Sequence, residues 1–175
     1  MVSMASAPGR STPADVDRAH DAAAAVLDPE LPMLTLADLG VLRSVTADGD
    51  RLVVTLTPTY TGCPALATMR ADVRIALQAA GFADVDVRTA LTPAWTTDWL
   101  TDHAREVLRE HGIAPPGRHA AGPVELPLLA AAPTTRCPRC GSTSTCETSR
   151  FGPTPCTAQH VCASCAEPFE RMKEL

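Results

Sequence analysis

The residues of this sequence with the most specific chemistry are four cysteines in its last forty residues. They form two Cys-x-x-Cys pairs, Cys137 with Cys140 and Cys162 with Cys165. Each pair places two thiolates on one tight turn, and two such turns facing each other supply the four sulfurs that a structural zinc ion prefers. The alternative is a disulfide framework, but residues 1–10 contain no apolar run long enough for an export signal. The spacing therefore predicts a zinc ribbon.

Two further cysteines, Cys146 and Cys156, lie between these pairs. Four-coordinate zinc does not need them, and each could be a small buried apolar side chain or a spare thiol. Cys156 lies on a Gly/Pro loop, where its thiolate could be an extra ligand for a second metal or an iron-sulfur cluster. Spacing alone does not distinguish a ligand from a buried thiol, so both interpretations stay open.

Cys63 is the cysteine of interest in the first part of the chain. It directly precedes Pro64, which suits the first position of a helix. We therefore expect its thiol at a helix N-terminus, where unpaired backbone N–H groups and the helix dipole stabilise a thiolate and lower its pKa. Such a cysteine is a metal ligand or a nucleophile; the alternative is a capping residue or a small buried one.

Hydrophobic periodicity predicts the elements that must position these cysteines. The pattern repeats every three to four residues in three segments and alternates in three others, and Gly81 and Gly112 are typical residues at helix ends. We expect helices over 15–27, 66–80 and 96–111 and strands over 41–46, 51–57 and 85–91.

The fold class that follows is α+β, a small three-stranded sheet packed with helices, followed by a proline-rich linker and a zinc ribbon. Five prolines between residues 115 and 133 indicate an extended, semi-rigid linker. The expected divisions are a disordered tail at 1–13, the α+β domain at 14–114, the linker at 115–133 and the ribbon at 134–175.

Composition excludes several classes of function. The net charge is −5, and the 15 Lys and Arg residues do not gather into a stripe, which argues against nucleic-acid binding. No apolar stretch reaches membrane-spanning length, and we expect reduced cysteines in the cytoplasm. The sequence has no Glu-x-x-His pair and no glycine-rich phosphate loop. We therefore expect no enzyme activity of the chain on its own.

Three motifs of the first domain resemble those of SufT-like iron-sulfur assembly factors. They are Asp28-Pro29-Glu30, Asp38-Leu39-Gly40 and Thr61-Gly62-Cys63-Pro64, and the resemblance covers about residues 15–92. The resemblance implies that Cys63 contacts a cluster or iron in transfer and that the acidic motifs border the same site. The residues it assigns to this transfer site are Cys63, Asp28, Glu30, Asp38 and Thr61.

Motifs farther along the chain are similar to those of the D-type (PaaD-like) accessory proteins of the bacterial phenylacetyl-CoA oxygenase, an epoxidase. They include Pro93-Ala94-Trp95, Phe151-Gly152-Pro153 and Glu167-Pro168-Phe169. The resemblance implies a maturation protein of phenylacetate catabolism that carries zinc and handles an iron-sulfur cluster or iron transiently. The expected partners are the oxygenase's reductase, which holds a [2Fe-2S] cluster and flavin, or its di-iron subunit; a homodimer is also compatible.

Two other functions compete with this expectation. The chain could be a non-catalytic scaffold of the oxygenase complex, with Cys63 merely structural. A nucleic-acid-binding zinc ribbon is the remote alternative.

Overall fold

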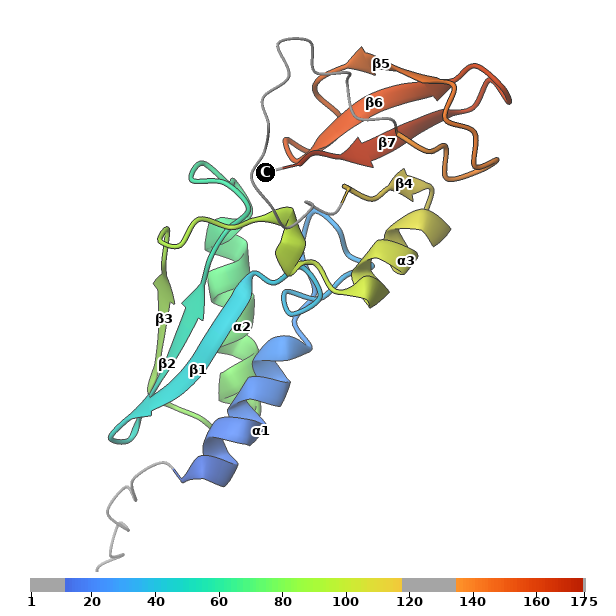
Figure 1. Cartoon of the computed structure of the whole chain (residues 1–175). Coiled ribbons are helices and arrows are strands. Elements are labelled where there is room, and N and C mark those ends of the chain that lie inside the picture. The colour runs from blue at the N-terminus through green and yellow to red at the C-terminus, as the bar shows by residue number, and fades with distance from the viewer. Residues whose placement is uncertain (1–11, 118–134, 175) are drawn as a thin grey trace, which may run out of the picture. The chain divides into compact units, whose positions relative to one another are not determined.

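The computed structural model describes residues 12–117 and 135–174. The expected tail at 1–13 and linker at 115–133 therefore lie almost entirely outside the described residues. The chain divides into two compact units, Met1–Ala94 and Trp95–Leu175, and each is considered by itself (Figure 1).

The first unit begins with helix α1, Pro13–Ala24. Thr12 and Asp15 cap its start reciprocally, since the Thr12 side chain accepts from Asp15 N and the Asp15 carboxylate accepts from Thr12 N. The helix ends three residues before the predicted end at residue 27. The reason is long-range pairing, because the Val26 carbonyl accepts a hydrogen bond from Leu36 N at 2.8 Å.

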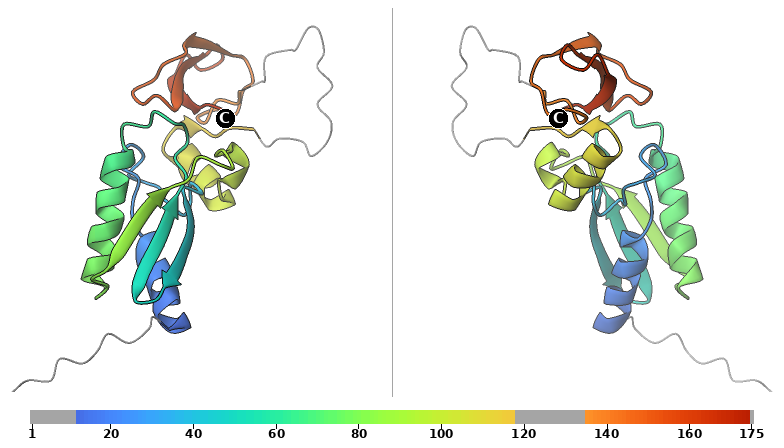
Figure 2. Two further views of the ribbon diagram at one scale, coloured as in Figure 1. Left: turned by 90° about the vertical axis from the view of Figure 1, so that its left-hand side faces the viewer. Right: turned by 90° about the vertical axis from the view of Figure 1, so that its right-hand side faces the viewer.

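A three-stranded sheet with the order β1-β2-β3 forms the centre of this unit. Strand β2 pairs antiparallel with β1 and parallel with β3, and α1 and α2 contact each other as well as the sheet (Figures 1 and 2). Leu52, Val53 and Val54 of β2 are all buried, as expected for a central strand. The elements are β1 (Leu42–Asp48), β2 (Arg51–Leu56), α2 (Leu66–Ala79) and β3 (Val85–Thr89).

The pairing of β1 with β2 brings two loops to one end of the sheet. Leu42, the first residue of β1, lies opposite Leu56, the last of β2. Beyond that pair, Thr57 N donates to the Val41 carbonyl at 2.8 Å. The segment before β1 and the segment after β2 therefore meet, and these segments contain the acidic motifs and Cys63.

The second unit contains a four-stranded sheet with the order β4-β7-β6-β5. The two-residue strand β4 pairs parallel with β7, and Ala114 of β4 packs in a buried cluster with Cys137, Cys162 and Phe169. The elements are η1 (Thr97–Trp99), α3 (Asp102–Glu110), β4 (Ile113–Ala114), β5 (Thr145–Ser149), β6 (Thr157–Cys162) and β7 (Pro168–Met172).

Two sequence expectations differ from this unit. The helix predicted over 96–111 is a short 3-10 helix and then α3, because the Thr101 side chain accepts from Ala104 N at 3.0 Å and starts a new helix. The first domain was expected to extend to residue 114, whereas residues 95–114 are compact with the ribbon. Besides β4, the buried Arg105 ties this segment together by donating to the Thr97 and Pro116 carbonyls at 2.7 Å each.

The α+β fold class with a three-stranded sheet and a separate cysteine-rich ribbon is confirmed. Among the helices of the described ranges, none has the length and apolar character needed to span a membrane.

Leu77 and Ile75 allow a matched test of the first unit's core. Both are on α2, but Leu77 is fully buried and Ile75 is 62% exposed. We expect Leu77→Ala to lower the unit's free energy of unfolding by about 2–5 kcal/mol, and Ile75→Ala to change it by less than about 0.5 kcal/mol. Native-state hydrogen exchange of the β2 amides measures both values; equal effects would contradict the packing.

Candidate functional site

The ribbon brings its four predicted zinc ligands together. The sulfurs of Cys137, Cys140, Cys162 and Cys165 all lie within 4.8 Å of one another. The Sγ atoms of Cys137 and Cys165 are 3.8 Å apart, and those of Cys140 and Cys162 are 3.6 Å apart. A tetrahedral zinc site with Zn–S bonds of about 2.3 Å has sulfurs about 3.8 Å apart, so the donor set fits zinc.

Two turns of the same form build this group. In the first, Gly141 N donates to the Cys137 carbonyl at 2.9 Å; in the second, Ala166 N donates to the Cys162 carbonyl at 2.8 Å. The fifth residue of each turn has a positive φ, 75° at Gly141 and 61° at Ala166. Alanine rarely adopts this left-handed conformation, so the second turn holds strain that the surrounding contacts must offset.

The electrostatics of the group favour a bound cation. Backbone N–H groups, that of Cys165 first, lower the pKa of Cys162 to about 6. The backbone N–H of Glu167 acts in the same sense on Cys165, but burial and the thiols of Cys140, Cys162 and Cys137 raise its pKa to about 12. Four thiolates this close repel one another, and a divalent cation removes the repulsion.

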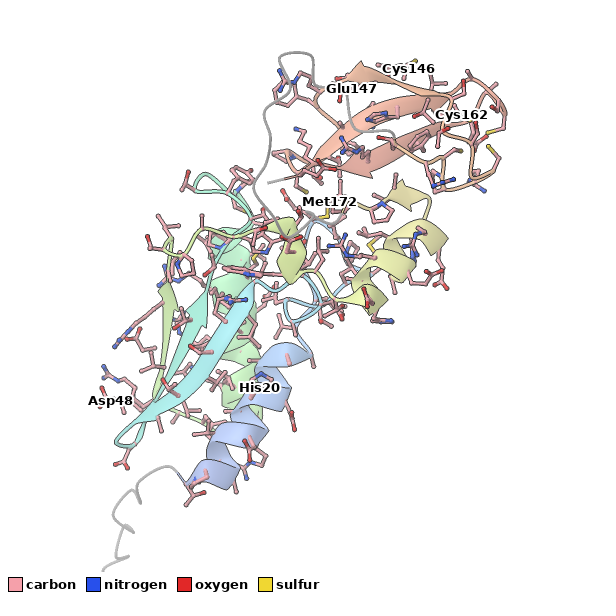
Figure 3. The ribbon with its side chains drawn as sticks, viewed as in Figure 1. His20, Asp48, Cys146, Glu147, Cys162 and Met172 are labelled. Carbon is pink, nitrogen blue, oxygen red and sulfur yellow. The ribbon has the colours of Figure 1, made fainter. Side chains whose placement is uncertain are left out.

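Cys156 and Cys146 lie outside this group. Cys156 is buried, and its Sγ is 3.1 Å from Thr154 Oγ1. Cys146 is exposed on β5, the strand beside β6, which ends at Cys162 (Figure 3). Within residues 12–117 and 135–174, the four ribbon cysteines are the one cluster of at least three potential ligands found close together. An additional ligand role for Cys156 stays a hypothesis.

Cys63 lies in the loop that leads from β2 into α2. The helix begins at Leu66 with Ala65 as its N-cap, so Cys63 precedes the cap by two residues. The side chain is only 8% exposed. Cys63 N donates to the Tyr60 carbonyl at 3.2 Å and Leu66 N to the Cys63 carbonyl at 3.3 Å, which fixes the turn.

The expected low pKa of Cys63 is wrong. Burial is the largest influence and raises its pKa, and the charges of Glu30 and Asp28 raise it further. The backbone N–H groups of Ala65 and Leu66 act in the opposite direction, as the helix-terminus argument required, but their effect is smaller. The thiol is therefore protonated at neutral pH.

Asp28 and Glu30 belong to one turn but have different roles. Asp28 is 4% exposed, and its Oδ1 accepts from Glu30 N and Leu31 N at 2.8 Å each. Burial raises the pKa of Asp28. Burial also raises the pKa of Glu30, and the Asp28 charge adds to this effect. Asp28 thus shapes the turn that presents Glu30, and both carboxylates act electrostatically on Cys63.

Asp38 and Thr61, the other predicted site residues, are placed differently. The Asp38 carboxylate accepts from Thr35 Oγ1 at 2.7 Å and from Thr35 N at 3.2 Å, while Thr35 Oγ1 accepts from Asp38 N. This reciprocal cap is a structural use of the carboxylate, and the spacing Thr-x-x-Asp could have revealed it. Thr61 is exposed, two residues before Cys63.

A cavity of about 630 Å³ in the second unit was not foreseen from the sequence. It borders Cys137 and is lined by Arg109, Arg136 and Arg171. The carboxylate of Glu174, also in the lining, accepts from Arg171 at 2.7 Å and from Gly117 N at 3.2 Å. An internal ion pair thus uses the most buried of these arginines, which supports a structural role for the cavity wall.

Removing a ribbon ligand should separate the two units in stability. Cys162→Ser leaves three sulfurs, so we expect loss of the one zinc per chain and of hydrogen-exchange protection in β5, β6 and β7, while β1–β3 stay protected. Native mass spectrometry and hydrogen exchange measure the two effects. Cys146→Ser is the control and should retain zinc; a Cys162→Ser chain that keeps its metal would contradict the four-sulfur site.

The raised pKa of Cys63 gives a second prediction. Iodoacetamide reacts with the thiolate, so Cys63 should be alkylated more slowly than the exposed Cys146 at pH 7 and more rapidly only above its ordinary pKa. Glu30→Gln removes a charge that raises the pKa, so the alkylation profile of Cys63 should move to lower pH. Mass-resolved labelling across a pH series measures this shift, with Glu110→Gln as the control. A profile of Cys63 that Glu30→Gln leaves in place would show that the two groups do not interact.

Comparisons with known proteins agree with both units. Residues 18–91 match the family model of iron-sulfur cluster assembly proteins, and residues 121–173 match that of the PaaD zinc beta ribbon domain. The expectation of a zinc ribbon is thereby confirmed, since the sulfur geometry fits the same metal.

Two curated relatives and one solved structure are similar to this chain. The D-type subunit of a putative 1,2-phenylacetyl-CoA epoxidase from Escherichia coli (strain K12) is 49% identical over 146 residues, covering 83% of this chain and 85% of the relative. An Fe-S protein maturation auxiliary factor from Porphyromonas gingivalis is 33% identical over 81 residues, 45% of this chain and 76% of the relative. The crystal structure of a domain of unknown function, DUF59, from Bacillus anthracis has 28% identity and a TM-score of 0.49, and the match covers 53% of this chain and 90% of that one.

The extent of the match to the E. coli protein, together with the specific ribbon model, settles the relationship. The chain belongs to the PaaD family, the D-type subunits of the 1,2-phenylacetyl-CoA epoxidase.

Proposed function

We propose that this chain is a maturation protein of the phenylacetyl-CoA epoxidase, which helps to deliver an iron-sulfur cluster or iron to one of the epoxidase subunits and is not an enzyme on its own. The observation that carries the proposal is the grouping of Cys63 with Glu30 and Asp28 at one end of the first sheet. These residues lie within the segment that matches iron-sulfur cluster assembly proteins. A relative of the same segment is named as a maturation factor.

The chemistry of this group suits transient binding of a cation. With two carboxylates nearby, the Cys63 thiol gives up its proton most readily when a positive ion arrives to offset the charge. Binding therefore releases a proton, and protonation of the sulfur can release the ion again. A single thiolate with carboxylates holds iron less firmly than four thiolates do, which suits a cargo that must be passed on.

The ribbon has the features of a module that carries structure rather than reactivity. Four protein sulfurs complete the coordination of zinc and leave no position for substrate or water. We infer that the zinc keeps the ribbon folded, and that the ribbon contributes contacts to the epoxidase. The proposed clients are the reductase, whose [2Fe-2S] cluster requires assembly, and the di-iron subunit.

A scaffold role is the second candidate, and one observation favours it. Cys63 is buried in a hydrogen-bonded turn, as a purely structural cysteine would be. In that case the epoxidase would need this chain continuously in its complex, whereas a maturation protein is dispensable once the epoxidase subunits are loaded.

The iron and sulfide content of the epoxidase subunits separates these functions. Cells in which Cys63→Ser replaces the natural chain should grow poorly on phenylacetate and yield a reductase or di-iron subunit low in iron, because the transfer site is lost. Cys146→Ser, which changes an exposed thiol, is the matched control and should give full loading. Fully loaded but inactive subunits from Cys63→Ser cells would overturn the maturation proposal and favour the scaffold.

A further inference from the structure

The loop between β5 and β6, residues 150–156, presents an aromatic side chain to solvent. Phe151 is 74% exposed, the highest value among the large hydrophobic side chains that the structure describes as exposed. Pro153 and Pro155 of the same loop are exposed too. The motif that begins at Phe151 is among those that led to the family, yet neither the zinc group nor the Cys63 site includes it.

Hydrogen bonds hold this loop in one conformation despite its exposure. Ser149 Oγ donates to the Phe151 carbonyl at 2.9 Å and lies 3.2 Å from the Phe151 N–H. Gly152 N donates to the Thr157 carbonyl at 3.0 Å. A Cβ on Gly152 would lie 2.2 Å from Thr157 Oγ1, so the close approach of these two segments requires glycine.

Lys173, just after β7, supports the loop from the side. Its Nζ donates to the Pro155 carbonyl at 2.8 Å and lies 4.7 Å from the centre of the Phe151 ring, a cation–π distance. The aromatic ring and the loop backbone are therefore fixed before any partner arrives. Preorganisation of this kind lowers the entropy cost of binding, and aromatic anchors are frequent energetic centres of interfaces.

The charge of the loop indicates what it can bind. Residues 148–157 contain Arg150 and no Asp or Glu, although the chain carries a net charge of −5. Lys173 adds a second cationic group beside the ring. The complementary surface is therefore an apolar pocket with carboxylates at its rim.

The loop is also separate from the zinc group. Strand β6 runs from Thr157 at the loop to Cys162 at the metal end, so the two features lie at opposite ends of a six-residue strand. Met172, which pairs with Thr157, and Cys162 mark these two ends in Figure 3. A change in the loop can thus be tested without touching a zinc ligand.

We propose that residues 150–156 are the docking point of this chain on the epoxidase, where Phe151 enters an apolar pocket rimmed by carboxylates on another epoxidase subunit. The inference rests on the proposed function in one respect, that the epoxidase subunits are the partner. It assigns the docking role to one loop, whereas cargo transfer stays with the first unit.

Binding of the full-length, zinc-loaded chain to the epoxidase subunits purified without it tests the proposal. Phe151→Ala should weaken the affinity about tenfold or more, and Phe151→Trp should retain most of it. Arg150→Glu should weaken binding and reduce its dependence on salt, since it reverses a charge that faces carboxylates. Leu91→Ala is the matched control, because Leu91 is an exposed apolar residue of the first unit, and it should bind normally. The zinc content of each variant verifies that the ribbon is folded.

The outcomes distinguish the docking proposal from the maturation proposal. If Phe151→Ala holds its zinc and binds as well as Leu91→Ala, the loop is not the docking point. Self-association of the chain that depends on Phe151, without binding to the epoxidase, would also overturn the proposal. Cys63→Ser should bind with unchanged affinity, so its effect on iron loading tests the maturation function independently of docking.

Discussion

Antiparallel strand pairing is the interaction on which both candidate sites depend. An antiparallel hairpin brings the start of its first strand and the end of its second to one place, whatever the length of the chain between them. In the first unit, the pair Leu42 and Leu56 joins the acidic segment to the Cys63 loop. In the second, Thr145 lies opposite Cys162, so the two metal-binding turns meet. Each site is therefore located at the open end of a hairpin.

The two hairpins use this arrangement for different chemistry. At the open end of the ribbon, four sulfurs enclose a metal and leave no ligand position. At the open end of the first sheet, one thiol and two carboxylates give a group with an unbalanced charge. A closed site suits a permanent ion and an unbalanced one suits an ion in passage, so the same topology supports a structural role in one unit and a transfer role in the other.

Local patterns predicted what local chemistry determines. The Cys-x-x-Cys spacing located the zinc group, and the Cys-Pro dipeptide located Cys63 next to a helix start. Long-range contacts determined the rest: α1 stops early because Leu36 pairs with Val26, and residues 95–114 join the ribbon because β4 pairs with β7. The ionisation of Cys63 was wrong for the same reason, since burial and the distant residues Asp28 and Glu30 outweigh the two N–H groups that the sequence reveals.

The burial of the Cys63 thiol also bears on its survival in a cell that handles molecular oxygen. Peroxide and related oxidants attack the thiolate, and over-oxidation to sulfinic or sulfonic acid is largely irreversible. A thiol that is 8% exposed and protonated at neutral pH resists this attack while it carries no cargo. The carboxylates that delay ionisation thus give the empty protein chemical durability, and the sulfur is in its vulnerable form chiefly when a metal already occupies its lone pair.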